Sequence, residues 1–362
     1  MNIEVARDDL HEVRTSANDQ RQLDDGEVRL AIDSFGLTSN NITYAVFGDL
    51  MQYWSFFPVP EPETSSWGRV PVWGFAHVEE TTVSHLAVGT RVFGYLPMAS
   101  SVVVIPGRFD DSGFTDLAPN RNDLPSVYNR YTFVTADPLY RETDEGLIML
   151  LRPLFITSFV IDDFIGDHDL FGAETMIISS ASSKTAIAAA HLLTQREGVS
   201  VIGLTSPANT EFVSSLDCYD HVITYDEVSS LPLSDALYID VAGRRDVTRA
   251  VHEHFGARLM YSMVVGDTHW DANDTDPAEL VGPRPEFLFA PVQIAKRRTD
   301  WGRDGFEENV GAAWDRFIPW TRQWMRPIDV DGAEEIIDTY RALLDGEIDP
   351  TVGHVCSFGA SR

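Results

Sequence analysis

The stretch from Glu174 to Ser206, ETMIISSASSKTAIAAAHLLTQREGVSVIGLTS, constrains the fold more than any other part of this 362-residue chain. An apolar run at 176–178 is followed by a turn of small residues at 179–185. Apolar residues then recur at near-helical spacing from Ile187 to Leu193, and a second apolar run covers 199–204. The order strand, turn, helix, strand is the βαβ unit of a nucleotide-binding sheet. Because the turn lacks the glycines that usually mark such a site, its chemistry has to come from serines and one lysine.

The same alternation continues after this stretch. The sequence predicts strands at 221–225, 236–241 and 258–266, and a helix at 246–255. Strands that alternate with helices form a parallel, doubly wound sheet. We therefore predict an α/β fold for this half of the chain.

The first half has a different character. Residues 1–26 look polar and irregular, 27–33 alternate like a strand, and 67–104 hold short strands broken by glycine and proline, which indicates an antiparallel barrel. The segment 109–137 is loop-like and contains Tyr128 and Tyr131, and long irregular segments are often functional. The remaining predicted elements are a buried helix with a proline kink at 147–165, helices at 305–324 and 333–344, and a closing strand at 354–358.

The charge balance limits the possible partners. The formal net charge is −29, so the surface repels phosphate backbones and nucleic acid is an unfavourable partner. Any anion site must therefore be built locally, and Lys184, in the small-residue turn, is one of only two lysines. We expect no membrane contact, because no window reaches the roughly 18 apolar residues of a span. The two cysteines form no disulfide framework or zinc motif, and no signal peptide is recognisable, which favours a reducing cytoplasm.

Several segments, in collinear order over nearly the whole chain, resemble the medium-chain dehydrogenase/reductase superfamily. They are GEVRLAIDSFGLTSNNITYAVFGD, HLAVGTRVFGY, PLFITSFVIDDFI, and AEEIIDTYRALLDGEI followed by GHVCSF. The resemblance is to the zinc-free, quinone-oxidoreductase-like branch. The turn SSASSKTA and the segment FLFAPVQIAKRRTDWG also resemble a bacterial subgroup of that superfamily without a settled activity.

The resemblance implies a two-domain protein: a GroES-like β-barrel catalytic domain at 1–145, completed by 320–362, and a Rossmann domain at 146–319. It also implies a small-molecule substrate and a possible homodimer. Two departures stand out. The glycine-rich turn of the superfamily is replaced by serines and a lysine, and the Gly-His-Glu motif of the zinc-dependent members is replaced by Gly74-Phe75-Ala76. We therefore predict that catalysis does not use zinc and that no metal is bound.

A phosphate site needs backbone N–H groups at a helix N-terminus, where the helix dipole attracts an anion. Hydroxyl side chains are the best substitutes for glycine here, since each adds a donor and caps the helix. The predicted pyrophosphate ligands are Ser180, Ser182, Ser183, Lys184 and Thr185. The alternative is a capped helix start with a solvated lysine, in which the cofactor site has decayed.

The end of the second strand distinguishes NAD from NADP. NAD-binding proteins commonly have Asp or Glu there for the ribose hydroxyls, whereas this chain has Thr205, Ser206 and Asn209, which can donate to a 2′-phosphate. We therefore predict NADP(H) as the cofactor rather than NAD, although no arginine near these residues in the sequence could bind the 2′-phosphate. By resemblance, the nicotinamide would lie near Thr157, Ala242, Gly243, Val265 and Gly266.

Hydride transfer without zinc needs a hydrogen-bond donor for the developing oxyanion. The resemblance places Asn41 and Tyr44 in a loop that lines the cleft, and Tyr53 is close in sequence, so these three are the predicted catalytic residues. A packed tyrosine with its hydroxyl satisfied is the alternative for each tyrosine. Two functions stay open: an NADP(H)-dependent oxidoreductase acting on a carbonyl, enone or quinone, and a non-catalytic nucleotide-binding or scaffolding descendant of the fold.

Overall fold

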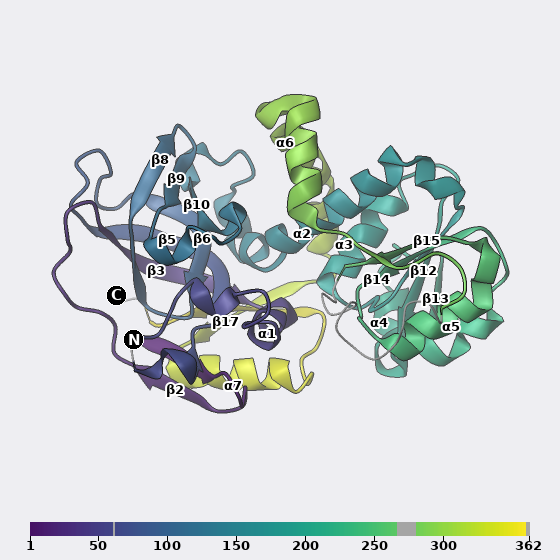
Figure 1. Ribbon diagram of the computed structural model, residues 1–362, viewed down its shortest axis with the longest axis horizontal. Helices are drawn as coiled ribbons and strands as arrows, with labels where there is room; N and C mark the ends of the chain where they lie inside the picture. The colour runs from purple at the N-terminus through teal and green to yellow at the C-terminus, as the bar shows by residue number, and fades with distance from the viewer. Residues whose placement is uncertain (61, 266–279, 360–362) are drawn as a thin grey trace. The chain divides into compact units, whose positions relative to one another are not determined.

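The computed structural model describes residues 1–60, 62–265 and 280–359. The chain divides into two compact units, Met1–Arg152 with Met325–Arg362, and Pro153–Trp324 (Figure 1). The boundary falls inside the long helix α2, Glu145–Asp167, next to its internal Pro153.

The first unit is mainly antiparallel. A nine-stranded sheet has the order β17-β18-β3-β5-β6-β10-β9-β8, with β7 paired to β3, and a second sheet has the order β2-β1-β4. The strands are β1 (Asn2–Ala6), β2 (Val13–Ser16), β3 (Val28–Leu37), β4 (Trp67–Gly68), β5 (Pro71–Thr81), β6 (Arg91–Pro97), β7 (Ser101–Val104), β8 (Pro106–Asp110), β9 (Gly113–Asp116), β10 (Arg130–Phe133), β17 (Arg326–Asp331) and β18 (Val352–Ser357). The α-helices are α1 (Ser39–Val46) and α7 (Ala333–Leu344), and short 3-10 helices include η1 (Tyr53–Ser55) and η4 (Ser126–Asn129).

Two segments predicted as irregular contain strands, so those predictions were wrong. All five residues of β1 are buried, because β1 is the central strand of its sheet and the Glu4 carboxylate bonds to Arg14, Arg69 and Ser16. Strands β9 and β10 lie within the segment 109–137. Runs of four or five residues with buried polar groups carry too weak an apolar alternation to be recognised.

The second unit contains a six-stranded sheet whose described pairings are all parallel. Its order, β13-β12-β11-β14-β15-β16, corresponds to 3-2-1-4-5-6, the order of a dinucleotide-binding sheet. The strands are β11 (Thr175–Ile178), β12 (Ser200–Thr205), β13 (His221–Thr224), β14 (Ala236–Asp240), β15 (Leu259–Val264) and β16 (Glu286–Phe287). The helices are the rest of α2, α3 (Lys184–Leu193), α4 (Thr210–Ser214), α5 (Arg245–Phe255) and α6 (Ala290–Thr321).

Alternate residues of the central strand face opposite sides of this sheet. Met176 and Ile178 belong to the cluster that includes α2 and α3, whereas Ile177 belongs to the cluster that includes α5. The sheet therefore has helices on both faces, and the predicted α/β, doubly wound fold is confirmed. Helix α6 starts well before the predicted residue 305 and is interrupted at Gly302, where φ is 75° (Figure 1).

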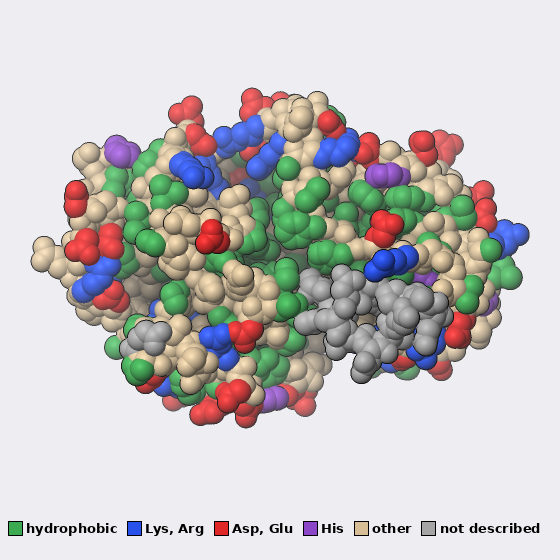
Figure 2. Space-filling model, viewed as in Figure 1, with side chains coloured by type: hydrophobic (Ala, Val, Ile, Leu, Met, Phe, Trp, Pro, Cys, Tyr) green, Lys and Arg blue, Asp and Glu red, His purple; other side chains and the backbone are tan. Residues whose placement is uncertain are grey.

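Acidic side chains are spread over the visible face of the molecule rather than gathered in one patch (Figure 2). Within the described part of the chain, no helix has both the length and the apolar character needed to cross a membrane.

Candidate functional site

The turn after β11 is fixed by a buried hydrogen-bond network. The Ser179 hydroxyl donates to the Asp240 carboxylate (2.8 Å) and accepts from the N–H groups of Val241 and Ala242 (2.9 Å each). Asp240, which is 2 % exposed, also accepts from the Gly243 N–H (3.0 Å). This network joins the ends of β11 and β14, the two strands between which the strand order reverses and where a ligand crevice forms in such sheets. The sequence analysis had not assigned a role to Ser179 or Asp240.

The serine turn itself leads into helix α3. Ser180 has a left-handed backbone (φ 52°), a conformation normally left to glycine. Ser183 caps α3, since its hydroxyl accepts the Ala186 N–H (3.3 Å). Ser180, Ser182, Ser183, Lys184 and Thr185 are all partly exposed. The turn therefore presents hydroxyls and one ammonium at a capped helix N-terminus, which is the arrangement an anion site requires.

The end of β12 lies beside this turn. The Ala181 N–H donates to the carbonyl of Leu204 (3.0 Å), and the Asn209 amide donates to the Ser182 hydroxyl (3.0 Å). Thr205 is 1 % exposed, and its hydroxyl is buried without a hydrogen-bond partner. A buried hydroxyl is expected to be paired, so an unpaired one next to a candidate phosphate site indicates a missing polar partner. Ser206 is partly exposed at the same strand end.

The residues predicted to lie near the nicotinamide are only partly close to one another in the structure. Ala242, Gly243 and Val265 are partly exposed beyond β14 and β15, and the Val265 N–H donates to the Asp240 carbonyl (2.8 Å). Gly266 lies outside the described residues. The Thr157 hydroxyl donates to the carbonyl of Pro153 within α2 (3.3 Å). Its neighbour Ser158 makes the contact with α3, since it donates to the Thr185 carbonyl (2.8 Å).

The structure also brings an arginine to this edge of the sheet, which the sequence analysis had not anticipated. The Arg244 guanidinium lies 4.9 Å from the ring centre of Tyr225, and it forms an ion pair with Asp246. Burial raises the pKa of Tyr225, and a hydrogen bond with the Ser180 backbone opposes this rise. The phenol of Tyr225 therefore lies next to the serine turn. Arg244 and Tyr225 come from the ends of β14 and β13, so only the folded sheet makes them neighbours.

Asn41, in the first unit, is fully used within the fold. Its side-chain oxygen accepts the Thr38 N–H (2.8 Å), and its amide donates to the Pro71 carbonyl (2.9 Å). With Thr38 it caps helix α1. The residue is 3 % exposed, and these bonds give it a structural role in the fold; its catalytic role stays a prediction.

Tyr44 and Tyr53 belong to one aromatic cluster. Their ring centres are 4.6 Å apart, and Tyr95, Tyr128 and Trp73 pack around them. Tyr44 is 6 % exposed, its hydroxyl accepts from the Trp73 indole (3.4 Å), and burial followed by the neighbouring Tyr53 raises its pKa. Tyr53 is partly exposed, and burial raises its pKa against the opposing effect of a hydrogen bond with Tyr128. Of the two, Tyr53 is therefore better placed to meet a ligand.

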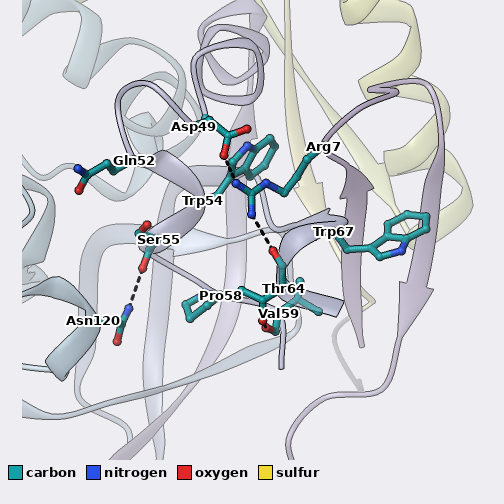
Figure 3. A pocket seen from close by; sticks show the side chains of 11 residues that line it. Arg7, Asp49, Gln52, Trp54, Ser55, Pro58, Val59, Thr64, Trp67 and Asn120 are labelled. Carbon is teal, nitrogen blue, oxygen red and sulfur yellow. Dashed lines mark hydrogen bonds and ion pairs between the residues drawn. The ribbon is translucent and has the colours of Figure 1, made fainter. Parts of the chain in front are cut away.

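The residue after Tyr53, Trp54, anchors this loop. Trp54 fits between two glycines, since a Cβ at Gly48 would lie 2.1 Å from its indole and a Cβ at Gly68 would lie 2.3 Å from it. A pocket of about 270 Å³ opens there, lined by Trp54 and Trp67 and by polar side chains such as Asn120 (Figure 3).

Arg7 bridges this pocket, because it pairs with Asp49 and donates to the Thr64 carbonyl (2.7 Å) (Figure 3). The Asn120 amide donates to the carbonyl of Ser55 (2.8 Å). The Asn120 contact holds the backbone two residues after Tyr53.

Within residues 1–60, 62–265 and 280–359, no three His, Cys, Asp or Glu side chains are grouped so that they could hold a metal ion. Cys218 and Cys356 are buried and free, and burial raises the pKa of the Cys218 thiol to about 12. The absence of zinc from the reaction stays a prediction.

The sequence of residues 35–349 matches a protein family described as "Protein of unknown function (DUF2855)". The chain belongs to this family. Because the match covers most of both units, the DUF2855 family comprises the two-unit architecture rather than one of its parts. No curated protein matches the sequence.

Several solved structures that are distant in sequence are similar to this DUF2855 protein. CurA from Vibrio vulnificus has a TM-score of 0.60 at 13 % identity and covers 97 % of this chain and 94 % of its own. It has also been solved in complex with NADPH. The quinone oxidoreductase from Coxiella burnetii has a TM-score of 0.57 at 12 % identity, with 98 % of both chains covered.

The yhdH oxidoreductase from Salmonella enterica, in complex with NADP, has a TM-score of 0.54 at 14 % identity and covers 96 % of this chain and 95 % of its own. The predicted resemblance is therefore confirmed as a fold: this DUF2855 protein shares the fold of CurA and of these two oxidoreductases.

Proposed function

We propose that the protein is an NADP(H)-dependent oxidoreductase that reduces a small carbonyl, enone or quinone compound without zinc. The observation that carries this proposal is the partly exposed serine-lysine turn at the capped N-terminus of α3, at the point where the parallel sheet reverses its strand order. The similar structures with NADPH or NADP bound support it as well.

The residues present fit a dinucleotide with a 2′-phosphate. Ser182, Ser183 and Lys184 would hold the pyrophosphate, since together they supply hydroxyl donors, backbone N–H groups and a point charge. Thr205 would gain the hydrogen-bond partner that its buried hydroxyl lacks. The residues from Thr205 to Asn209 include no carboxylate that would repel the 2′-phosphate. That residues 146–319 act as the dinucleotide-binding domain remains a prediction.

The nicotinamide cofactor, when bound, supplies the hydride. The chain then has to stabilise negative charge on the substrate oxygen and deliver a proton. We assign this role to Tyr53 rather than to Tyr44 or Asn41, because Tyr53 is partly exposed whereas the other two are buried and bonded within the fold. Burial raises the pKa of Tyr53 and so keeps the phenol protonated as a donor, while the hydrogen bond with Tyr128 opposes that rise.

The direct test is calorimetric titration of the full chain with NADPH, compared with Lys184→Ala. We expect NADPH to bind with a dissociation constant well below about 1 mM, or roughly 4 kcal/mol, and Lys184→Ala to weaken it at least about tenfold. Lys296→Ala is the matched control, since Lys296 pairs with Asp167 and Asp300 on helices away from the turn. If wild-type protein binds neither NADPH nor NADH, the proposal fails.

Turnover separates the oxidoreductase from a non-catalytic nucleotide-binding or scaffolding protein. That alternative draws on the engaged Ser182 hydroxyl and the absence of a glycine turn. With NADPH and a panel of quinones, enones and aldehydes, Tyr53→Phe should reduce kcat by about a hundredfold and leave NADPH affinity unchanged. Tyr140→Phe, outside the aromatic cluster, should retain activity. Binding of NADPH without turnover of any panel compound would favour the alternative.

A further inference from the structure

One arginine of the second unit, Arg244, has an exposed carboxylate, that of Asp246, as its ion-pair partner. Arg244 follows β14, is about half exposed, and lies with its guanidinium 4.9 Å from the ring centre of Tyr225. Its ion-pair partner Asp246 is more exposed still, with 66 % of the side chain accessible. Exposed pairs of this kind contribute little stability, so the guanidinium can exchange Asp246 for a stronger anion at small cost.

The position of the Tyr225 ring is fixed relative to the end of β12. Thr205 pairs with Thr224 in the parallel register of β12 and β13, so Tyr225 is the next residue after the one beside Thr205. Adjacent strands lie about 4.8 Å apart. The strand end that distinguishes NAD from NADP is therefore next to the residue that supports Arg244.

The chemistry of this edge matches a terminal phosphate monoester. A guanidinium stacked on an aromatic ring keeps its edge donors free for bidentate bonds to phosphate oxygens. The ring also limits the conformations of the side chain, so less entropy is lost when those bonds form. In a protein of net charge −29, a phosphate is repelled over most of the surface, and one correctly placed arginine then has a large effect on selectivity.

We propose that Arg244, supported by the ring of Tyr225, binds the 2′-phosphate of the nucleotide and makes the protein selective for NADP(H) over NAD(H). This inference rests on the proposed function, since it needs a dinucleotide on the serine turn. Thr205 and Ser206 complete the phosphate contacts from the end of β12. The selectivity therefore depends on an arginine that precedes α5 and a tyrosine that directly follows β13, not on a residue of the second strand alone.

The test is the ratio of dissociation constants for NADPH and NADH, measured by calorimetry on the full chain. Arg244→Ala should weaken NADPH by about ten- to a hundredfold and leave NADH within about twofold. Arg245→Ala is the matched control, because it removes the same charge from the adjacent exposed position. It should change the NADPH-to-NADH ratio by less than about threefold. Tyr225→Leu should lose part of the selectivity, since it removes the ring on which Arg244 stacks but keeps the guanidinium.

The possible outcomes separate this inference from the proposed function. If wild-type protein binds NADPH but Arg244→Ala binds it equally well, the inference is overturned and the oxidoreductase proposal stands. Equal losses for NADPH and NADH would also overturn it, since Arg244 would then serve the adenosine rather than the 2′-phosphate. Titration with 2′,5′-ADP and with 5′-AMP repeats the comparison without the nicotinamide: only 2′,5′-ADP should lose affinity in Arg244→Ala.

Discussion

The hydroxyl of Ser179 donates a 2.8 Å hydrogen bond to the carboxylate of Asp240, 61 residues later in the chain. Both residues are almost fully buried. The same hydroxyl accepts two backbone N–H groups, so its one donor and both acceptor sites are used. The bond joins the ends of the two strands that flank the proposed nucleotide site. The serine turn therefore depends on Asp240, which no local sequence pattern connects with it.

Replacing Ser179 should destabilise the second unit more than replacing any other serine of the turn. Ser179→Ala leaves two N–H groups without their acceptor and removes one hydrogen bond from the buried Asp240 carboxylate, at a cost of about 2–3 kcal/mol. Ser182→Ala is the control, because Ser182 is partly exposed and accepts a hydrogen bond from the side chain of Asn209, and it should cost less than about 1 kcal/mol. Urea unfolding of both variants provides the measurement. Equal destabilisation would mean that the Ser179 network is not critical.

The pattern of the sequence was sufficient to predict the βαβ unit and the doubly wound sheet. Buried strands such as β11 and β12 are continuous apolar runs, and α3 has apolar residues at helical spacing, so each can be predicted from a short stretch of sequence. The strands β1, β9 and β10 have no such signal, because tertiary partners rather than local pattern bury them.

The candidate site was only partly predictable for the same reason. The turn residues Ser180 to Thr185 are contiguous, so the sequence identified them together. Asp240, Tyr225 and Arg244 reach the turn only through the strand order, and no short window contains all of them. The capping bonds between Asn41 and Thr38 could not be foreseen either, because a polar residue in a predicted loop shows no partner in the sequence.

Gly68→Ala should strongly destabilise the first unit. A Cβ at this position would lie 2.3 Å from the indole of Trp54, a rigid group that Gly48 confines from another side. Overpacking of this kind costs about 1–3 kcal/mol or more. The double variant Gly68→Ala, Trp54→Leu removes the clash, so it should be less destabilised than the sum of the two single variants, as thermal unfolding can measure. Additive effects would show that the ring is not trapped there.

Added salt should raise the unfolding temperature. Fifty-six acidic residues against 27 basic ones leave an excess of 29 negative charges, which repel one another most strongly in the folded state. Screening is weak at 10 mM salt, where the Debye length is about 30 Å, and strong at 1 M, where it is about 3 Å. We expect the midpoint to rise by several degrees between these limits at pH 7.5. The rise should shrink near pH 5, close to the isoelectric point of about 4.5. A midpoint independent of salt at pH 7.5 would contradict this.

His191 should make stability depend on pH between 4 and 6.5. Its ring stacks on Trp320 of α6, with centres 4.4 Å apart, and its Nε2 is buried without a partner. Burial, followed by the nearby Arg316, lowers the pKa of His191 to about 4 from its ordinary value of 6.5. In this window the unfolded chain therefore binds the proton and the folded chain does not.

The sign follows from this difference. The contribution of neutral His191 is fully present above pH 6.5 and decreases as the pH falls toward 4, because unfolding then takes up a proton. The slope stays below the one-proton limit of about 1.4 kcal/mol per pH unit, since the folded and unfolded states differ by less than one bound proton at this site. In urea unfolding from pH 8 to 5, wild-type protein should lose more stability than His191→Phe, whereas His221→Gln, at an exposed position, should follow wild type. Buried His252, whose pKa burial also lowers, is common to all three proteins and cancels from the comparison. Parallel pH profiles for wild type and His191→Phe would show that His191 is not protonated on unfolding in this range.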